Sequence, residues 1–540
     1  MCKTEIYITS SLEKIFPHSE PCLAMNKASV LQNEKYHFQL VIRSDEDATS
    51  LSLCVGEQCR AAVRLFDVGL VKGGPAWMEF HDEYYISKKE GLYPDVLFPH
   101  RDGFALTGGE NKAVYVRVDC SRLPVGENKL TFSVAGASAE FCLTVLPCKL
   151  VESDLILTNW IHVDCICDQH GVEPFTEAFY RVFDRYLDWY VEMGNNTMFT
   201  PILTPPLDTA VGGERRTVQL VDIAKTATGY AFDFTRLKEF FDFCLARGIR
   251  YFEFSQLATQ WGAKACPKVV VRGEKGEEKL FGWDVSSGSE EYFAFLAQFL
   301  PALCDFVKEN GLSERVFFHI SDEPKEEEAD QYRRFGRYVR GLLGDMKILD
   351  TMSARTFYDE GLVDIPALTT LGADCLKEGE MPCLLYYCSV EFDDYYSNRF
   401  FCMPLQRTRV LGCQLYCNDA IGFLHWGYNF YYSYLSKEKL DPYEVSDAQG
   451  YFPSGDSFVV YPVEGGAVPS VRLMTMLEAF QDYRALKTLE KGRGKEFVSA
   501  LLAGEGVSGV TTYPRSAEWQ LAFREKINAL IAEDGESDER

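Results

Sequence analysis

From Leu155 onward the chain alternates short apolar runs with longer amphipathic stretches, and this repeat constrains the fold more than any other feature. In the first amphipathic stretch, Phe179, Phe183 and Tyr190 recur at helical spacing, and Gly194 stands where a C-terminal cap belongs. The other helices are predicted over residues 235–247, 290–309 (with a kink at Pro301), 324–343 and 471–489. Strands alternating with helices of this length favour parallel strands joined by crossover helices.

The apolar runs between these helices are typical of strands that are buried on both faces, because they lack alternation and are rich in β-formers. They cover residues 156–163, 197–203, 250–254, 316–320, 347–349, 367–371, 384–388 and one or two segments between 412 and 426. About eight such units predict an α/β fold of the (β/α)8 TIM-barrel type rather than an open doubly wound sheet. Neither GxGxxG nor GxxxxGK[ST] occurs, which removes the usual nucleotide-binding loops.

The first 150 residues follow a different pattern, in which apolar and polar residues alternate as in half-buried strands. Such strands are predicted over residues 36–41, 113–118, 130–134 and 141–145, with a turn at 124–128. We therefore expect three parts: an N-terminal antiparallel β-sandwich over 1–150, a catalytic barrel over 151–490, and a helical segment over 491–540 with a disordered acidic tail. The sandwich gathers no convergent polar residues, so we expect it to support the barrel.

Charge and targeting signals limit the partners and the location of the chain. Its formal charge of −25 and pI near 4.9 argue against binding to nucleic acid or to anionic membranes. The N-terminal segment MCKTEIYITSSLEKIF lacks the apolar core of a secretory signal, and no run of about 18 apolar residues occurs, so we expect a cytoplasmic protein.

The 18 cysteines contain no CxxC pair, and we interpret them as mostly buried, reduced thiols. Cys165, Cys167 and His170 lie close together in the sequence, but two thiols and one imidazole lack a fourth ligand and the spacing of a zinc site. We expect neither a metal nor a cofactor.

The strand predicted over 316–320 leads directly into two adjacent acids, Asp322 and Glu323, which are followed by Pro324. In barrels of this type the active site lies at the C-terminal ends of the strands, where this pair would be placed. Helix capping is the alternative, since Ser321 or Asp322 is a good N-cap and a glutamate suits the first turn of a helix.

Aromatic and polar residues also gather at the ends of the other predicted strands. Any one of them could plug the barrel mouth or cap a helix, but together they offer flat aromatic faces with carboxylates, amides and arginine between them. A sugar ring requires that combination, so we expect a small oligosaccharide or glycoside as the ligand. The candidate substrate-binding residues are Trp160, His162, Asp164, Asp208, Trp261, His319, Tyr386, Tyr387, Asn398, Arg399, Trp426, Tyr428 and Asn429.

Six segments make a family resemblance visible. TPPLDT, QWGA, FGW, FHISDEP, SNRF and GFLHWGYNFY, in this order, resemble the domain of unknown function 4091 group, which is related to glycoside hydrolase family 123, the retaining β-N-acetylgalactosaminidases. The resemblance covers about residues 155–490, and the family also has a β-sandwich before its barrel. It implies that Asp322 and Glu323 match the family's adjacent catalytic pair, with Glu323 as acid/base and Asp322 orienting the substrate's acetamide.

The chemistry of two neighbouring carboxyls leads to the same mechanism by a separate route. A conventional retaining glycosidase holds its two carboxyls ~5–5.5 Å apart across the scissile bond, which neighbours in sequence would struggle to do. If the substrate's own 2-acetamido oxygen attacks the anomeric carbon, both acids can approach from one strand end. Because successive side chains of a strand point to opposite faces, the turn before Pro324 must then rotate Glu323 inward.

Several assignments stay open at this point. Tyr386, Tyr387 and Tyr428 are equal candidates for binding the acetamide carbonyl, and Trp426, then Trp261, are favoured as the stacking platform.

Three functional hypotheses follow. The leading one is an exo-acting retaining β-N-acetylhexosaminidase, with the galactosamine configuration favoured by the resemblance alone. A second is a glycosidase for sugars without an acetamide, in which Asp164, Asp208 or Glu253 is the nucleophile. A third is a non-catalytic carbohydrate-binding protein. The sugar linkage, the leaving group and the oligomeric state are left open by the sequence.

Overall fold

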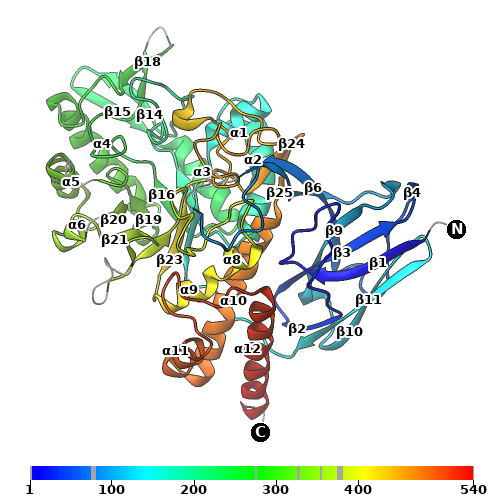
Figure 1. Cartoon of the computed structure of the whole chain (residues 1–540). Coiled ribbons are helices and arrows are strands. Elements are labelled where there is room, and N and C mark those ends of the chain that lie inside the picture. Colours follow the sequence, from blue (N-terminus) through cyan, green and yellow to red (C-terminus); the bar gives the residue numbers. More distant parts are fainter. Residues whose placement is uncertain are drawn as a thin grey trace.

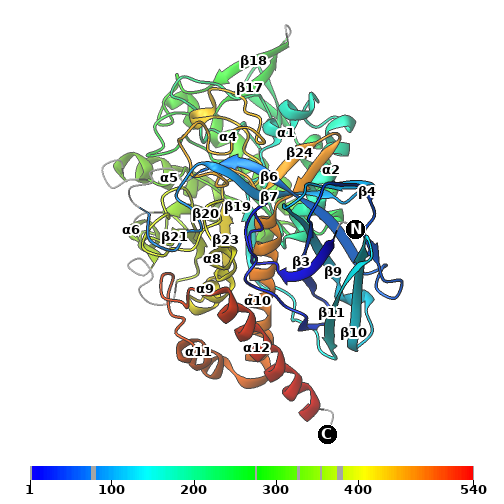
Figure 2. The ribbon, with the colours of Figure 1, turned by 45° about the vertical axis from the view of Figure 1, so that its right-hand side comes forward.

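The computed structural model describes residues 3–74, 81–273, 276–324, 329–352, 355–373 and 381–538. An N-terminal β-domain lies on one side and a barrel with surrounding helices on the other, and helix α10 (Val471–Arg493) runs along their junction (Figures 1 and 2).

Eight parallel strands close into a barrel in the order in which they occur in the sequence, and the last strand pairs with the first. They are β12 (Ile156–Asn159), β13 (Thr197–Thr200), β16 (Tyr251–Phe254), β19 (Val316–Phe318), β20 (Lys347–Met352), β21 (Ile365–Thr369), β22 (Leu384–Tyr386) and β23 (Gly422–His425). At the closing seam a Cβ on Gly422 would lie 2.1 Å from the Ile156 carbonyl oxygen, so only glycine fits there. Each strand overlaps one of the predicted apolar runs, and the TIM-type fold is confirmed.

Helices follow the strands on the outside of the barrel. They are α1 (Val163–His170), α2 (Glu177–Glu192), α3 (Thr235–Ala246), α4 (Glu290–Glu309), α5 (Ala329–Leu343), α6 (Thr356–Asp359), α8 (Leu405–Arg409) and α9 (Leu411–Cys417). Thr176 and Ser289 cap α2 and α4, because their hydroxyls accept from the backbone N–H groups of Phe179 and Tyr292. Helix α4 continues through Pro301, and the predicted start of α5 at Pro324 borders residues 325–328, which lie outside the described residues.

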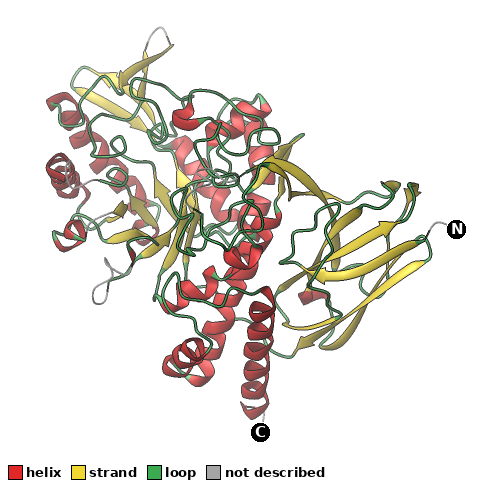
Figure 3. Ribbon diagram, viewed as in Figure 1, coloured by secondary structure: helices red, strands yellow, loops and turns green. Residues whose placement is uncertain are grey.

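The N-terminal domain consists of two packed sheets, as predicted (Figure 3). One contains β1 (Thr4–Ser10), β3 (Lys35–Ser44), β9 (Asn111–Asp119), β6 (Val63–Gly73) and β7 (Gly91–Pro99). The other contains β2 (Lys27–Leu31), β11 (Ala137–Leu146), β10 (Gly126–Val134) and β5 (Cys54–Val55). Phe38 and Phe141 stack between them with centroids 4.6 Å apart. All pairings are antiparallel except β2 with β11, which is parallel. A small pair, β4 (Ala48–Leu51) with β8 (Phe104–Leu106), lies beside them.

Two β elements within the barrel region were not predicted. A four-stranded sheet of β14 (Asp222–Thr226), β15 (Gly229–Asp233), β17 (Val269–Gly273) and β18 (Gly276–Phe281) lies at the end of the molecule far from the N-terminus (Figure 3). A hairpin of β24 (Val460–Val463) and β25 (Gly466–Pro469) precedes α10. Both arise from segments inserted after barrel strands, and each of their strands spans only four to six residues, which is too short for a clear periodic signal.

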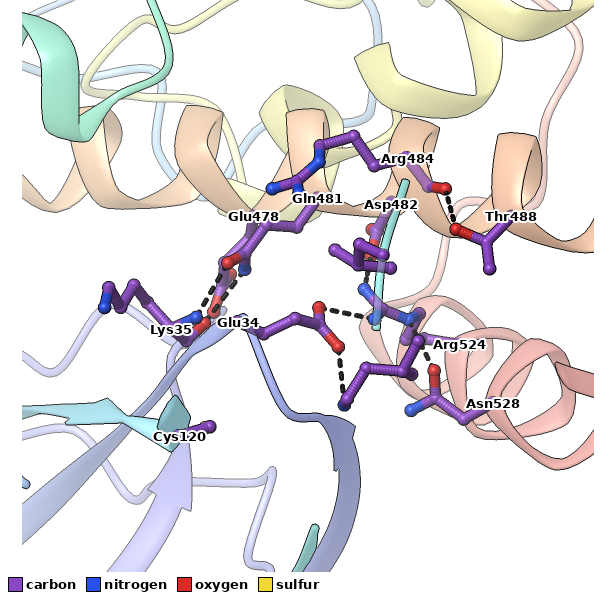
Figure 4. Close-up of polar contacts among 12 residues, drawn as sticks. Glu34, Lys35, Cys120, Glu478, Gln481, Asp482, Arg484, Thr488, Arg524 and Asn528 are labelled. Carbon is purple, nitrogen blue, oxygen red and sulfur yellow. Dashed lines mark hydrogen bonds and ion pairs between the residues drawn. The ribbon is translucent and has the colours of Figure 1, made fainter. Parts of the chain in front are cut away.

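A buried polar network joins the N-terminal domain to the C-terminal helices (Figure 4). The guanidinium of Arg524 donates to Glu34 of the sandwich and, at 2.8 Å, to Asp482 of α10. Gln481 accepts from the backbone N–H of Lys35 and donates to its carbonyl, at 2.8 and 2.9 Å. The two domains therefore share a polar junction in addition to a continuous apolar core.

The C-terminal segment forms α11 (Lys495–Gly504) and α12 (Ala517–Asp538). Helix α12 continues through most of the acidic stretch that the sequence predicts to be disordered. Arg493 forms ion pairs of 2.9 Å with both Glu533 and Asp534, which holds this part of the helix against α10. No helix among the described residues is both long and apolar enough to cross a bilayer.

Candidate active site

A pocket of about 200 Å³ opens beside the C-terminal ends of the barrel strands. Residues that follow seven strands or lie in the long loops line it: Trp160, Leu207, Asp208, Gln260, Trp261, Asp322, Glu323, Thr351, Tyr386, Cys388, Ser389, Leu424, Trp426, Tyr434 and Phe452. Three are carboxylic acids and six are aromatic, so the pocket combines acid groups with flat apolar walls.

The adjacent acids Asp322 and Glu323 lie side by side in this pocket because the backbone turns sharply after β19. Glu323 has φ of +41°, a left-handed conformation that non-glycine residues rarely adopt. Thr351, at the end of β20, holds both residues: its hydroxyl donates to Asp322 Oδ1 at 2.6 Å and accepts from the Glu323 backbone N–H at 3.0 Å. The Tyr386 hydroxyl donates to Glu323 Oε1 at 2.5 Å. Both side chains thus bond within the pocket, which favours a chemical role over capping.

Two of the three carboxyl groups in the pocket, those of Asp322 and Asp208, have a raised pKa. Burial, and then the charge of Glu323, raise the pKa of Asp322 well above its usual range, and the hydrogen bond from Thr351 acts in the opposite direction. Burial raises the pKa of Asp208 to about 6; the charge of Arg215 opposes this, while that of Glu323 adds to it. Two buried acids with raised pKa values are therefore able to hold protons near neutral pH.

A buried ion network lies directly beneath the pocket. His319 sits between two carboxylates, with Nε2 2.6 Å from Glu253 and Nδ1 3.1 Å from Asp350. Burial by itself would lower the pKa of His319, but the bonds to Asp350 and Glu253 raise it to about 10. Glu253 also accepts from the Trp160 indole at 2.9 Å, and Asp350 accepts from the backbone N–H of Ser321 at 3.2 Å. The network fixes the position of Trp160 and the start of the turn that carries Asp322 and Glu323.

A second buried cluster supports the loop that carries Asp208. Arg215 forms a bidentate pair with Asp164, at 2.7 and 2.9 Å, and donates to the carbonyl of Leu207 at 3.0 Å. It also donates to His162 Nδ1 at 3.2 Å, so Nε2 of His162 carries the hydrogen that bonds to the Trp426 carbonyl at 2.8 Å. Burial, and then Arg215, lower the pKa of His162 to about 4, so this histidine is neutral.

A third buried cluster lies behind Trp426. The guanidinium of Arg399 donates to His425 Nδ1 and to the carbonyl of Asp456, both at 2.8 Å, and also to the Gly427 carbonyl. Burial lowers its pKa to about 9. The Asp456 carboxyl, whose pKa is raised to about 7 by burial, accepts from the Trp426 indole at 3.2 Å. Arg399 therefore acts on the pocket through the segment that holds this tryptophan.

The family of this chain can be identified from its similarity to known proteins. The model of the family described as "Glycoside hydrolase 123, catalytic domain" matches residues 160–489, which is more than half of the chain. The chain belongs to glycoside hydrolase family 123. It is therefore a glycosidase by family, and the matched range contains every residue that lines the pocket.

A similar solved structure supports the fold of this family 123 chain. A family 123 glycoside hydrolase from Clostridium perfringens superposes with a TM-score of 0.74 at 14% identity, and the match covers 99% of this chain and 98% of that one. A family 2 β-galacturonidase from Eisenbergiella tayi gives 0.33 at 10% identity, covering 88% and 71%. A β-D-glucuronidase from Dictyoglomus thermophilum gives 0.32 at 8%, covering 87% and 73%. No curated protein sequence matches the chain.

Seven of the residues predicted for the site line the family 123 pocket: Trp160, Asp208, Trp261, Asp322, Glu323, Tyr386 and Trp426. The other predicted residues do not line this pocket: His162, Asp164, His319, Tyr387, Asn398, Arg399, Tyr428 and Asn429. All of the latter are buried, and all except Tyr387, whose hydroxyl has no hydrogen-bond partner among the described residues, form side-chain hydrogen bonds to other parts of the protein.

The positions of four of these residues have simple physical causes. The Tyr428 hydroxyl donates to the Tyr186 carbonyl on α2 at 2.8 Å, and Tyr387 packs its ring on His425, outside the barrel interior. Asn429 bonds to both backbone groups of His162, at 2.8 and 3.1 Å. Asn398 donates to the Cys388 carbonyl at 2.7 Å and thereby fixes a wall of the pocket.

Several pocket residues were missed by sequence reasoning. Thr351 is the most informative, because the strand predicted over 347–349 ends too early, whereas β20 continues to Met352. Gln260 belongs to the segment QWGA, whose tryptophan alone was singled out. The others that were missed are Leu207, Cys388, Ser389, Leu424, Tyr434 and Phe452.

The cysteine and histidine group near α1 has other partners. Cys165 Sγ accepts from the Tyr431 N–H at 3.4 Å, and His170 Nε2 lies 3.1 Å from the Tyr186 hydroxyl. Within the described ranges, no group of three or more histidine, cysteine or acidic side chains has the arrangement of a metal site.

Proposed function

We propose that this chain is an exo-acting retaining β-N-acetylgalactosaminidase whose nucleophile is the substrate's 2-acetamido oxygen. The observation that supports the proposal is the side-by-side placement of Asp322 and Glu323 in one pocket. Two neighbouring acids on one side of a sugar suit a mechanism in which the protein supplies no nucleophile. The β-galacto configuration rests on family membership.

Five pocket residues have a role in this proposal. Glu323 protonates the leaving oxygen and then deprotonates the attacking water. Asp322 accepts the acetamide N–H and stabilises the positive oxazolinium. Of the three candidate tyrosines only Tyr386 lines the pocket, and its hydroxyl becomes available to the acetamide carbonyl once Glu323 carries the proton. Trp160 and Trp426 supply aromatic faces for the sugar's C–H groups.

Assays on aryl glycosides test the proposal. We expect release of nitrophenol from p-nitrophenyl β-N-acetylgalactosaminide, a loss of at least about 100-fold in Glu323→Gln, and inhibition by a thiazoline that mimics the oxazoline. Glu177→Gln, an exposed position in the first turn of α2, is the matched control and should retain full activity. Full activity in Glu323→Gln would refute the proposal, and nitrophenol release excludes a purely binding role.

A second candidate function has one observation in its favour. Asp208 lines the same pocket, so it is placed to act as a nucleophile on a β-glycoside that lacks the acetamide. The other two acids considered, Asp164 and Glu253, are buried and bonded to Arg215 and to His319. Cleavage of a plain β-galactoside with no preference for the acetamide, abolished in Asp208→Asn, would favour this function over the first.

The choice of natural substrates to assay follows from the relative. The study of the Clostridium perfringens enzyme concerns the hydrolysis of glycolipid glycans. We therefore include oligosaccharides with a terminal β-linked N-acetylgalactosamine in the panel, alongside the corresponding glucosaminides.

A further inference from the structure

Part of the N-terminal domain reaches across to the barrel. Residues 81–86, which precede β7 in the sequence, lie against the segment that follows β22 (Figure 2). The Tyr85 hydroxyl donates to the Phe392 carbonyl at 2.7 Å, and the Asp82 carboxylate accepts from the Tyr395 backbone N–H at 2.8 Å. The N-terminal domain therefore bonds directly to the backbone of a loop at the C-terminal end of a barrel strand.

A buried ion pair anchors this contact. The guanidinium of Arg407 on α8 donates to the two carboxylate oxygens of Asp82 at 2.9 and 2.8 Å, and to the Tyr396 carbonyl at 2.7 Å. The side chain of Arg407 is 0% exposed and that of Asp82 is 5% exposed. Because removing one partner of a buried ion pair is costly, Asp82 keeps a fixed position beside the loop.

The C-terminal part of the chain holds the same loop. The Tyr513 hydroxyl donates to the Tyr395 carbonyl at 2.7 Å, and the guanidinium of Arg515 lies 3.2 Å from the centre of the Tyr395 ring. Asp394 and Tyr395 have φ of +48° and +64°, a left-handed conformation that persists only where the surroundings enforce it. The residues that enforce it here come from both ends of the chain.

The held loop continues directly from a wall of the pocket. Cys388 and Ser389 line the pocket and come just before residues 392–396 in the sequence. Asn398, just after these residues, donates to the Cys388 carbonyl at 2.7 Å, so the two ends of the loop are tied together. The Asn398 carbonyl in turn accepts from the Thr408 hydroxyl on α8 at 2.9 Å. The position of the wall therefore depends on what holds residues 392–396.

We propose that Asp82, Tyr85 and Tyr513 are positioning residues of the active site, because they fix the wall formed by Cys388 and Ser389. They touch no substrate and act through residues 392–396. All three lie outside residues 160–489, the range of the catalytic domain. The N-terminal domain therefore takes part in substrate binding and is more than a support for the barrel. This inference rests on the proposed function only in the choice of the assay substrate.

Two variants that each remove one hydroxyl test this role. Tyr85→Phe and Tyr513→Phe keep the ring but leave a backbone carbonyl of the loop without its donor. We expect KM for p-nitrophenyl β-N-acetylgalactosaminide to rise about fivefold in each variant, which is the usual effect of losing one hydrogen bond. The value of kcat should stay within about twofold, because Thr351 and Tyr386, and not this wall, hold the two adjacent acids.

Hydrogen exchange reports on the wall without any substrate. The backbone amides of residues 388–396 should exchange about fivefold faster in both variants, because local opening becomes easier by the same factor. Tyr338→Phe is the matched control, since the Tyr338 hydroxyl donates to the Phe293 carbonyl at 2.8 Å and joins α5 to α4, and neither residue lines the pocket. It should change neither KM nor the exchange of residues 388–396.

The two measurements together decide the matter. Unchanged exchange of residues 388–396 in both variants would overturn the positioning role. Faster exchange with an unchanged KM would overturn it as well, since the wall would then not contribute to binding. An equal rise of KM in Tyr338→Phe would do the same, because any lost hydroxyl would then have this effect. If the wild-type protein cleaves no aryl glycoside, the proposed function fails, while the exchange rates still decide whether these hydroxyls hold the wall.

Discussion

The hydroxyl of Thr351 allows a sharp test of what sets the pKa of Asp322. It donates to Asp322 Oδ1 at 2.6 Å, and this bond lowers the pKa of Asp322 against the raising effects of burial and of Glu323. Thr351→Val replaces the hydroxyl by a methyl group of similar size. A hydrogen bond to a charged group contributes about 1.5–3 kcal/mol, and about 1.4 kcal/mol corresponds to one pH unit, so we expect the pKa of Asp322 to rise by about 1–2 pH units.

The assay is the pH dependence of inhibition by the thiazoline, whose positive charge on binding requires an ionised Asp322. As the pH falls, Asp322 takes up a proton and inhibition weakens. Since the variant raises the pKa of Asp322, weakening should begin at a pH about 1–2 units higher than in the wild-type protein.

Thr351→Ser is the matched control for this prediction. It keeps the donor to Asp322 and the acceptor for the Glu323 backbone N–H, so its pH profile should coincide with that of the wild type. An unchanged profile in Thr351→Val, in a protein with a wild-type unfolding midpoint, would contradict the reasoning. It would mean that this hydrogen bond does not control the ionisation of Asp322.

Three further predictions concern stability and the pocket wall. The pKa of His319 is raised from 6.5 to about 10. The stability that protonated His319 contributes is therefore complete below pH 6.5 and is lost as the pH rises through about 10. His319→Gln should flatten this pH dependence of the free energy of unfolding in urea titrations. Arg524→Met leaves the buried carboxylate of Glu34 without its cation and Asp482 with Arg409 alone, and should lower the free energy of unfolding by about 3–5 kcal/mol, whereas Arg181→Met, at an exposed pair, should change it by less than about 1 kcal/mol. Asp82→Asn weakens the bidentate pair with Arg407 that joins the N-terminal domain to α8, and should raise KM in steady-state assays.

The barrel could be predicted because its signal is local and repeated. An apolar run followed by a helical period needs only neighbouring residues to be recognised, and each of the eight strands overlaps a predicted run. The inserted sheet of β14, β15, β17 and β18 could not be predicted from the sequence, because its strands are about five residues long and β14 and β15 are polar on one face. Strands of that length depend on tertiary partners more than on their own pattern.

The position of Asp322 and Glu323 at a strand end of the barrel could be predicted, but the faces to which the other strand-end residues point could not. Tyr386 points into the pocket and Tyr387 away from it, as successive residues of a strand must. In a strand that is buried on both faces both residues are apolar or aromatic, so the sequence carries no sign of which one faces the barrel interior. The same limit applies to Asp164, whose partner Arg215 is 51 residues away in the sequence.

The left-handed conformation of Glu323 explains how a strand end can present two neighbouring acids to one substrate. In a regular strand Asp322 and Glu323 would point to opposite faces, and only one of them would reach the pocket. With φ of +41° at Glu323 both enter it, and the strain of this conformation is balanced by bonds from Thr351 on β20 and Tyr386 on β22. The geometry of the pair is therefore a product of barrel closure, because the residues that hold it come from neighbouring strands. Helix capping, which the local sequence suggested equally, requires none of these partners.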